Sequence, residues 1–262
     1  MIPSRTTQAG GSPWIVISRP VARPRMRLLC FHHAGGSAAS FRDWPGELPA
    51  DVEVCAVQLP GRGTRFGEAP FTRMQALIES LDPTLAPLLD VPFVLFGHSM
   101  GALVAFELTR HLRRRNGPRP AHLFVAAFGA PQIPSSDPIA HTLPDPLFLA
   151  ELRRYGGIPE SVVQEPELLE LFLPIVRADF EVLETTLHAP EEPLDVPISV
   201  FGGLDDRMNP PDILEAWRAQ TRGDFTRRMF PGDHFFIQSA RAALIPLVSQ
   251  ALRAPGQGEA GP

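Results

Sequence analysis

Short apolar runs recur along the chain, and most of the intervals between them carry helical patterns. Six runs are typical of buried strands because they are rich in apolar side chains and are bounded by turn residues. They are residues 27–33, 52–58, 92–96, 122–128, 197–201 and 225–230. Strands that alternate with helices pair in a parallel sheet whose two faces are covered by the helices. The pattern therefore predicts the α/β fold class, with a mostly parallel central sheet flanked by helices.

The clearest helical pattern lies between the second and third apolar runs. Its apolar residues recur at the spacing of one helix face: Met74, Leu77, Ile78, Leu81, Leu85 and Leu88. We expect this helix to cover one face of the sheet.

The longest interval without a strand pattern lies between the fourth and fifth runs. It carries two helical patterns, over residues 144–155 and 166–187, and Pro174 is expected to kink the second. Each apolar residue there could equally belong to ordinary core packing. An apolar insertion near the catalytic edge of a sheet is nevertheless a natural wall for an acyl chain. We interpret residues 135–190, approximately, as a helical lid.

Length and charge narrow the class of protein. At 262 residues, 44% of them hydrophobic, the chain fits a single domain over residues 14–253. Residues 1–13 and 254–262 are rich in small and polar residues, and we expect them to form flexible tails. The formal net charge of -5 argues against nucleic-acid binding, since no excess of positive charge faces the phosphates.

Two further features bear on the compartment. No apolar stretch is long enough to span a bilayer and the N-terminal residues lack the form of a signal peptide, so we expect a cytoplasmic protein that does not contact membranes. Cys30 and Cys55 both lie inside apolar runs, which favours buried free thiols over a disulfide.

A Gly-x-Ser-x-Gly segment, residues 97–101, lies between the third apolar run and a helical pattern. A strand, a sharp turn and a helix in this order are typical of a nucleophile elbow, which predicts Ser99 as the catalytic nucleophile. Gly97 and Gly101 leave room for the strand and the helix to approach each other. The motif alone is weak, and its context strengthens it.

A serine nucleophile needs an imidazole base and a carboxylate that orients the imidazole. Functional groups gather at the carboxyl ends of parallel strands, and His234 follows the last predicted strand on a glycine-containing loop. Asp205 and Asp206 both follow the fifth strand. We favour Asp206 because it stands three residues after Gly203, and Asp205 stays the alternative.

Backbone N–H groups of Ala34 and Met100 are the expected oxyanion-hole donors. Met100 follows the nucleophile at the start of a helix, and Ala34 lies in the glycine-rich loop after the first strand. The neighbouring His32 and His33 could instead form a metal pair. Adjacent residues of a strand point to opposite faces and no cysteine or carboxylate cluster accompanies them, so we do not favour this alternative.

Several segments together resemble the type II thioesterases that accompany polyketide synthases and non-ribosomal peptide synthetases, within the α/β-hydrolases. The resemblance covers most of the chain and rests on residues 30–37, 58–63, 96–102, 202–206 and 230–236, and on 155–159, 171–174 and 177–180 in the insertion. Two departures occur: His32 stands where the family often has proline, and Arg207 follows Asp206 where proline is common.

This resemblance implies an α/β-hydrolase fold with a helical lid. No phosphate loop, dinucleotide fingerprint or metal cluster appears in the sequence, so we expect no cofactor or metal. The resemblance also implies hydrolysis of acyl groups from the phosphopantetheine arm of an acyl carrier protein or peptidyl carrier protein, which clears stalled or misprimed synthase modules. A carboxylesterase or lipase that acts on small oxygen esters would use the same residues, and it stays the alternative. We expect a monomer.

Basic residues suggest where an acidic carrier protein would dock. Arg110, Arg113, Arg114 and Arg115 lie far along the helix that follows Ser99, so we interpret them as a solvated helix C-terminus. Better placed are Arg62 and Arg65 after the second strand, and Arg153 and Arg154 in the insertion.

Overall fold

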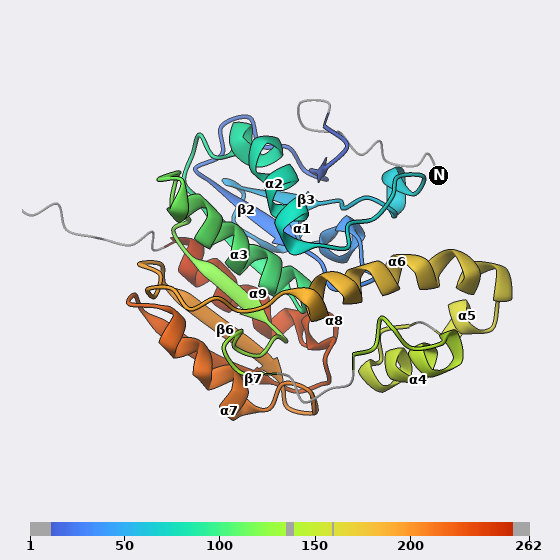
Figure 1. Ribbon diagram of the computed structural model, residues 1–262. Helices are drawn as coiled ribbons and strands as arrows, with labels where there is room; N and C mark the ends of the chain where they lie inside the picture. The colour runs from blue at the N-terminus through green and yellow to red at the C-terminus, as the bar shows by residue number, and fades with distance from the viewer. Residues whose placement is uncertain (1–11, 135–138, 159, 254–262) are drawn as a thin grey trace, which may run out of the picture.

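The structure is a computed structural model that describes residues 12–134, 139–158 and 160–253 (Figure 1). The predicted tails, apart from residues 12 and 13, and the predicted start of the insertion at residues 135–138 lie outside the described residues.

A seven-stranded sheet forms the centre of the described chain, in the order β1-β3-β2-β4-β5-β6-β7. The strands are β1 (Ile15–Val16), β2 (Met26–Phe31), β3 (Val52–Val57), β4 (Phe93–His98), β5 (Leu123–Ala126), β6 (Ile198–Gly203) and β7 (Phe225–Phe230). Strands β2 to β7 pair in parallel, and only β1 runs antiparallel, against β3. The six predicted strands are confirmed. Strand β1 was not predicted, because two residues are too few to show a strand pattern.

Helices cover both faces of the sheet (Figure 1). They are α1 (Trp44–Glu47), α2 (Met74–Leu85), α3 (Met100–Arg114), α4 (Asp145–Tyr155), α5 (Glu160–Val163), α6 (Pro166–Thr185), α7 (Pro211–Glu215), α8 (Phe236–Ser239) and α9 (Arg241–Arg253). The apolar face of α2 confirms the predicted helix, although Leu88 belongs to the short 3-10 turn that follows it.

The two faces bury separate apolar clusters. Leu29 of β2 packs into the cluster that includes Leu81 of α2 and Phe106 of α3. Leu28, the preceding residue, packs into the opposite cluster with Trp44 and with Leu244 of α9. This alternation is the two-residue period of a strand that is buried on both faces.

Helices α4, α5 and α6 lie between β5 and β6 in the chain, where the insertion was predicted. Figure 1 shows them extending beyond one end of the sheet. Phe148 and Leu152 of α4 pack with Val176 and Phe180 of α6 in a third apolar cluster, so the insertion has its own small core. Pro174 lies inside α6, which continues to Thr185.

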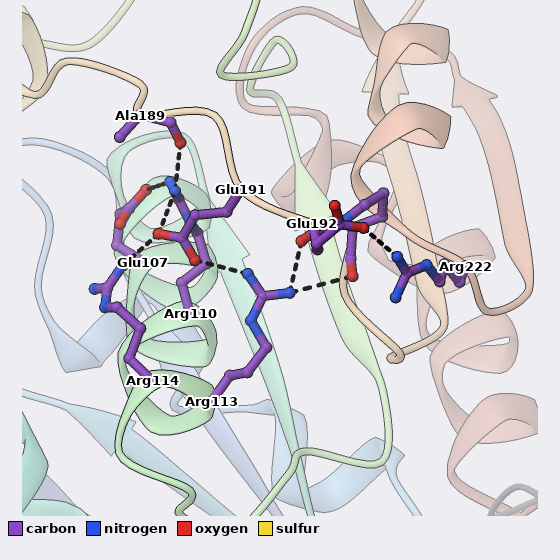
Figure 2. Close-up of polar contacts among 9 residues, drawn as sticks. Glu107, Arg110, Arg113, Arg114, Ala189, Glu191, Glu192 and Arg222 are labelled. Atoms are coloured by element: carbon purple, nitrogen blue, oxygen red, sulfur yellow. Dashed lines mark hydrogen bonds and ion pairs between the residues drawn. The ribbon is translucent and has the colours of Figure 1, made fainter.

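After α6 the chain returns to β6 along the last turns of α3 (Figure 2). The Glu191 carboxylate accepts hydrogen bonds from Arg110 (2.5 Å), Arg113 (2.7 Å) and Arg114 (2.7 Å). Arg110 also donates to the carbonyl of Ala189 and is only 2% exposed. The expectation of a solvated helix end is therefore wrong for Arg110, because the returning segment covers it.

Arg115, at the end of the same helix, forms an ion pair with Asp82 of α2 at 2.7 Å. None of the helices within the described ranges is long and apolar enough to cross a membrane.

Candidate active site

Ser99 lies at the sharp turn between β4 and α3, with a φ of 54° and a ψ of -118°. A positive φ is uncommon for a residue with a side chain and stores strain at the site. A Cβ on Gly97 would lie 2.2 Å from the carbonyl oxygen of Gly101, and a Cβ on Gly101 would lie 2.1 Å from that of Phe31. Only glycine fits these two positions, as the elbow motif predicts.

A hydrogen-bonded chain joins the three predicted catalytic side chains. The Oγ of Ser99 lies 2.9 Å from Nε2 of His234, and Nδ1 of His234 lies 2.9 Å from Oδ2 of Asp206. These residues follow β4, β7 and β6, whose carboxyl ends lie at the same edge of the sheet. The structure thus brings together groups that lie far apart in the sequence.

The two candidate carboxylates differ in their surroundings. Asp206 is 5% exposed, whereas Asp205 is exposed and its backbone N–H donates to the carbonyl of Gly232. Asp206 also accepts hydrogen bonds from the Asn209 side chain (2.9 Å) and the Met208 N–H (3.0 Å). Burial opposes its ionisation, but the hydrogen bonds and the His234 ring outweigh burial and lower the pKa of Asp206.

Asn209 is a residue of the site that sequence reasoning missed. Its amide donates to Asp206 from three residues further along the same loop. An acidic residue followed three positions later by asparagine is a common pattern, so it does not predict a catalytic site.

His98, the residue before the nucleophile, supports the histidine loop. Its Nε2 donates a hydrogen bond to the carbonyl of His234 at 2.8 Å, and the ring is fully buried. Burial, with the nearby His234 ring, lowers the pKa of His98 to about 3, so the ring is neutral at physiological pH. His98 therefore holds the loop in place without adding charge to the site.

The predicted oxyanion-hole donors lie on the two segments that flank the nucleophile. Met100 is the first residue of α3, so its N–H has no acceptor within the helix. Ala34 lies in a tight turn after β2 that is closed by the Gly36 N–H on the carbonyl of His33 at 2.9 Å. Strands β2 and β4 are neighbours, with Phe31 paired to Gly97, which brings this turn to the elbow.

The two adjacent histidines of that loop lie in different environments. Nδ1 of His32 donates to the carbonyl of His33 at 2.8 Å, and burial lowers the pKa of His32 to about 4. The His33 ring packs edge-on against His98 and Phe235 near the catalytic residues. Within the part of the chain that the structure describes, no group of three or more His, Cys, Asp or Glu side chains is placed to hold a metal ion.

An open cavity of about 1320 Å³ adjoins Ser99 and extends under the insertion. Leu152 and Tyr155 of α4 and Val176 and Phe180 of α6 form part of its wall. Ligand cavities usually measure about 300 to 1,000 Å³. The cavity beside Ser99 is larger than this range, so it has room for a long ligand.

Two of the arginines expected to contact a carrier protein are not available at the surface. Arg62 and Arg65 are each 5% exposed. Arg62 pairs with Asp179, and Arg65 pairs with Glu68 and stacks over Trp14. The docking prediction is therefore wrong for both residues. Arg153 and Arg154 are exposed, and their role in docking stays a prediction.

Comparison with known proteins finds many relatives, of which three are described here. The gramicidin S biosynthesis protein GrsT of Aneurinibacillus migulanus is 41% identical, over 92% of this chain and 94% of its own. The RedJ thioesterase from the prodiginine biosynthetic pathway in Streptomyces coelicolor superposes with a TM-score of 0.82 at 38% identity, over 89% of this chain and 91% of its own.

The third, YbtT, is a type II thioesterase from the yersiniabactin NRPS/PKS biosynthetic pathway (non-ribosomal peptide synthetase and polyketide synthase). It superposes with a TM-score of 0.79 at 32% identity, over 91% of this chain and 97% of its own. These neighbours confirm the predicted α/β-hydrolase fold. Residues 26–252 match the model of the thioesterase domain family. The chain therefore belongs to the thioesterase domain family and is a hydrolase that acts on thioesters.

Proposed function

We propose that this thioesterase is a type II editing enzyme that removes stalled or misprimed acyl groups from carrier proteins of a polyketide or non-ribosomal peptide synthase. The hydrogen-bonded chain of Ser99, His234 and Asp206 beside a large cavity carries the proposal. The relatives support the substrate class, because YbtT is a type II thioesterase of an NRPS/PKS pathway and GrsT serves gramicidin S biosynthesis.

In the acylation step, the Ser99 oxygen attacks the carbonyl carbon of the thioester while its proton passes to Nε2 of His234. Nδ1–H of His234 donates a hydrogen bond to Asp206. This bond fixes the tautomer of His234 and stabilises the imidazolium that forms. The tetrahedral oxyanion accepts hydrogen bonds from the N–H groups of Ala34 and Met100. When the carbon–sulfur bond breaks, the thiol of the phosphopantetheine arm leaves with the proton from His234.

The acyl-serine is then hydrolysed by the same groups. Water attacks the ester carbonyl as His234 takes its proton, and the Ser99 oxygen leaves with that proton. The released acid departs through the open cavity. We assign the wall formed by α4 and α6 the role of a lid that receives the acyl chain, and we place the enzyme in the cytoplasm as a monomer.

The test is hydrolysis of acetyl-loaded carrier protein by the wild type and by Ser99→Ala, followed as loss of acyl mass from the carrier. We expect the wild type to clear the carrier and Ser99→Ala to lose nearly all activity, since the nucleophile is absent. A matched set of acetyl thioester and acetyl oxygen ester separates this function from the esterase alternative. A wild type that leaves the loaded carrier intact but cleaves oxygen esters would contradict the proposal.

A further inference from the structure

A carboxylate from the lid binds the backbone next to the proposed oxyanion hole. Oδ2 of Asp179, on α6, accepts a hydrogen bond from the Gly35 N–H at 2.7 Å. The same carboxylate forms a bidentate pair with the Arg62 guanidinium, at 2.5 and 2.8 Å. Both side chains are buried, with Asp179 3% exposed and Arg62 5% exposed.

The bond from Gly35 fixes the turn that carries Ala34. The turn runs from His33 to Gly36, and Gly35 occupies its third position with a φ of +73°. The hydrogen bond that closes such a turn uses the carbonyl of the first residue and the N–H of the fourth, so the N–H groups of the second and third residues have no partner within the turn. Asp179 accepts the Gly35 N–H, and within the described residues the Ala34 N–H donates no hydrogen bond, so it is free for a ligand.

Helix α6 also packs directly on this turn. A Cβ on Gly35 would lie 2.9 Å from a ring carbon of Phe172 and 2.9 Å from a methyl of Val176. The turn therefore touches α6 through both an ionic hydrogen bond and van der Waals contact. Any shift of α6 at this level must move the turn as well.

Arg62 ties the same carboxylate to the opposite side of the loop. Its Nε donates to the carbonyl of Pro60 at 3.0 Å, and its Nη1 lies 3.5 Å from the carbonyl of Gly36. A buried carboxylate without a cation would be costly, so Arg62 is what allows a charged acceptor at this position. A charged acceptor holds an N–H about twice as strongly as a neutral one.

We propose that Asp179, held by Arg62, is a positioning residue for the oxyanion hole, through which lid helix α6 fixes the direction of the Ala34 N–H. This proposal rests on the proposed function in one respect, namely that the Ala34 N–H is a donor of the oxyanion hole. It applies to any acyl substrate that Ser99 attacks, so oxygen esters test it even if the carrier substrate is wrong.

The experiment compares Asp179→Ala and Asp179→Asn with Glu181→Ala as the matched control. Glu181 lies on the same helix and pairs with Arg73 of the body, but its hydrogen bonds do not reach the oxyanion loop. Active serines are counted in each variant with a fluorophosphonate. The values of kcat per active serine and KM are then measured with an acetyl N-acetylcysteamine thioester and with p-nitrophenyl acetate.

We expect Asp179→Ala to lower kcat about 10- to 100-fold on both substrates and to leave KM within about twofold of the wild type. One oxyanion-hole donor contributes roughly 100- to 1,000-fold to the rate, and a misplaced donor loses part of that contribution. Asp179→Asn retains an acceptor oxygen and should fall between the wild type and Asp179→Ala. Glu181→Ala should match the wild type.

A second measurement tests how strongly the site binds an oxyanion. A methyl trifluoromethyl ketone forms a tetrahedral adduct with the serine, and its inhibition constant should rise in parallel with the fall in kcat/KM. Unchanged kcat per active serine in Asp179→Ala, or an unchanged inhibition constant beside a lowered kcat, would overturn the proposal. So would the loss of active serines in both Asp179 variants while Glu181→Ala retains them, since the pair would then serve stability alone. If the wild type itself does not hydrolyse the acetyl thioester, the result counts against the proposed function and not against the role of Asp179.

Discussion

Two of the contacts between arginine and carboxylate side chains that join α6, or the chain that leaves it, to the body of the protein differ in depth and in what they touch. The Arg62 and Asp179 pair is buried and binds the loop beside the nucleophile. The Glu191 cluster is partly exposed and binds the last turns of α3 (Figure 2). Arg110 stands eleven positions after Ser99, roughly 16 Å along the helix.

This difference indicates that one ion pair can act on the reaction centre while the other only stabilises the fold. The buried pair can transmit the position of α6 to the reaction centre because it bonds to the catalytic loop. The Glu191 cluster fixes the chain that leaves α6, at a distance from the chemistry. We therefore expect changes in the first cluster to affect both stability and kcat, and changes in the second to affect stability alone.

The largest effect is expected from Arg62→Met. It leaves the Asp179 carboxylate buried without a cation, which should lower the free energy of unfolding by about 3 to 5 kcal/mol. The thermal unfolding midpoint measures this change, and kcat per active serine should fall with it.

A double variant, Arg62→Met with Asp179→Leu, sharpens this result. Replacing both buried charges by apolar groups should restore much of the stability, while kcat should stay low because Gly35 has lost its acceptor. Recovery of kcat together with stability would show that the pair has no role of its own in catalysis.

A smaller effect is expected from Glu191→Gln. It weakens three hydrogen bonds from arginines and leaves the buried Arg110 with the Glu107 carboxylate alone, which should cost about 1 to 3 kcal/mol in unfolding experiments. The values of kcat and KM for the acetyl thioester should stay within about twofold. A fall in kcat comparable to that of Asp179→Ala would remove the distinction between the clusters.

The Glu191 contribution should also depend on pH. Burial opposes its ionisation, but the three arginines outweigh burial and lower the pKa of Glu191 from 4.5 to about 2. Because the folded state holds the lower pKa, the stabilisation is present above about pH 4.5 and is lost as the pH falls toward 2. The difference in unfolding midpoint between the wild type and Glu191→Gln should therefore shrink between pH 6 and pH 3.

The smallest effect is expected from Glu192→Gln. Glu192 pairs with Arg222 beside the same cluster, but both side chains are more than half exposed. Water and salt screen such a pair, so its loss should change the free energy of unfolding by less than about 1 kcal/mol. High salt should abolish the difference from the wild type, whereas a larger, salt-independent loss would contradict this interpretation.

Features that depend on neighbouring residues could be predicted from the amino-acid pattern. Apolar runs bounded by turn residues predicted six of the strands, and the spacing of one apolar helix face predicted helix α2. The nucleophile elbow could be predicted because the residues that its tight turn requires, Gly97, Ser99 and Gly101, are almost adjacent in the sequence. The positions of Ser99, Asp206 and His234 after three of the predicted parallel strands likewise indicated which side chains meet.

Tertiary structure alone decided the features that depend on direction or on distant partners. Asp205 and Asp206 are neighbours of the same type, and only the path of the loop turns one of them toward His234. Arg62 and Asp179 stand 117 positions apart, and as isolated charges they resembled surface residues. Ion pairs carry no local period, so their partners and their burial follow only from how the helices pack.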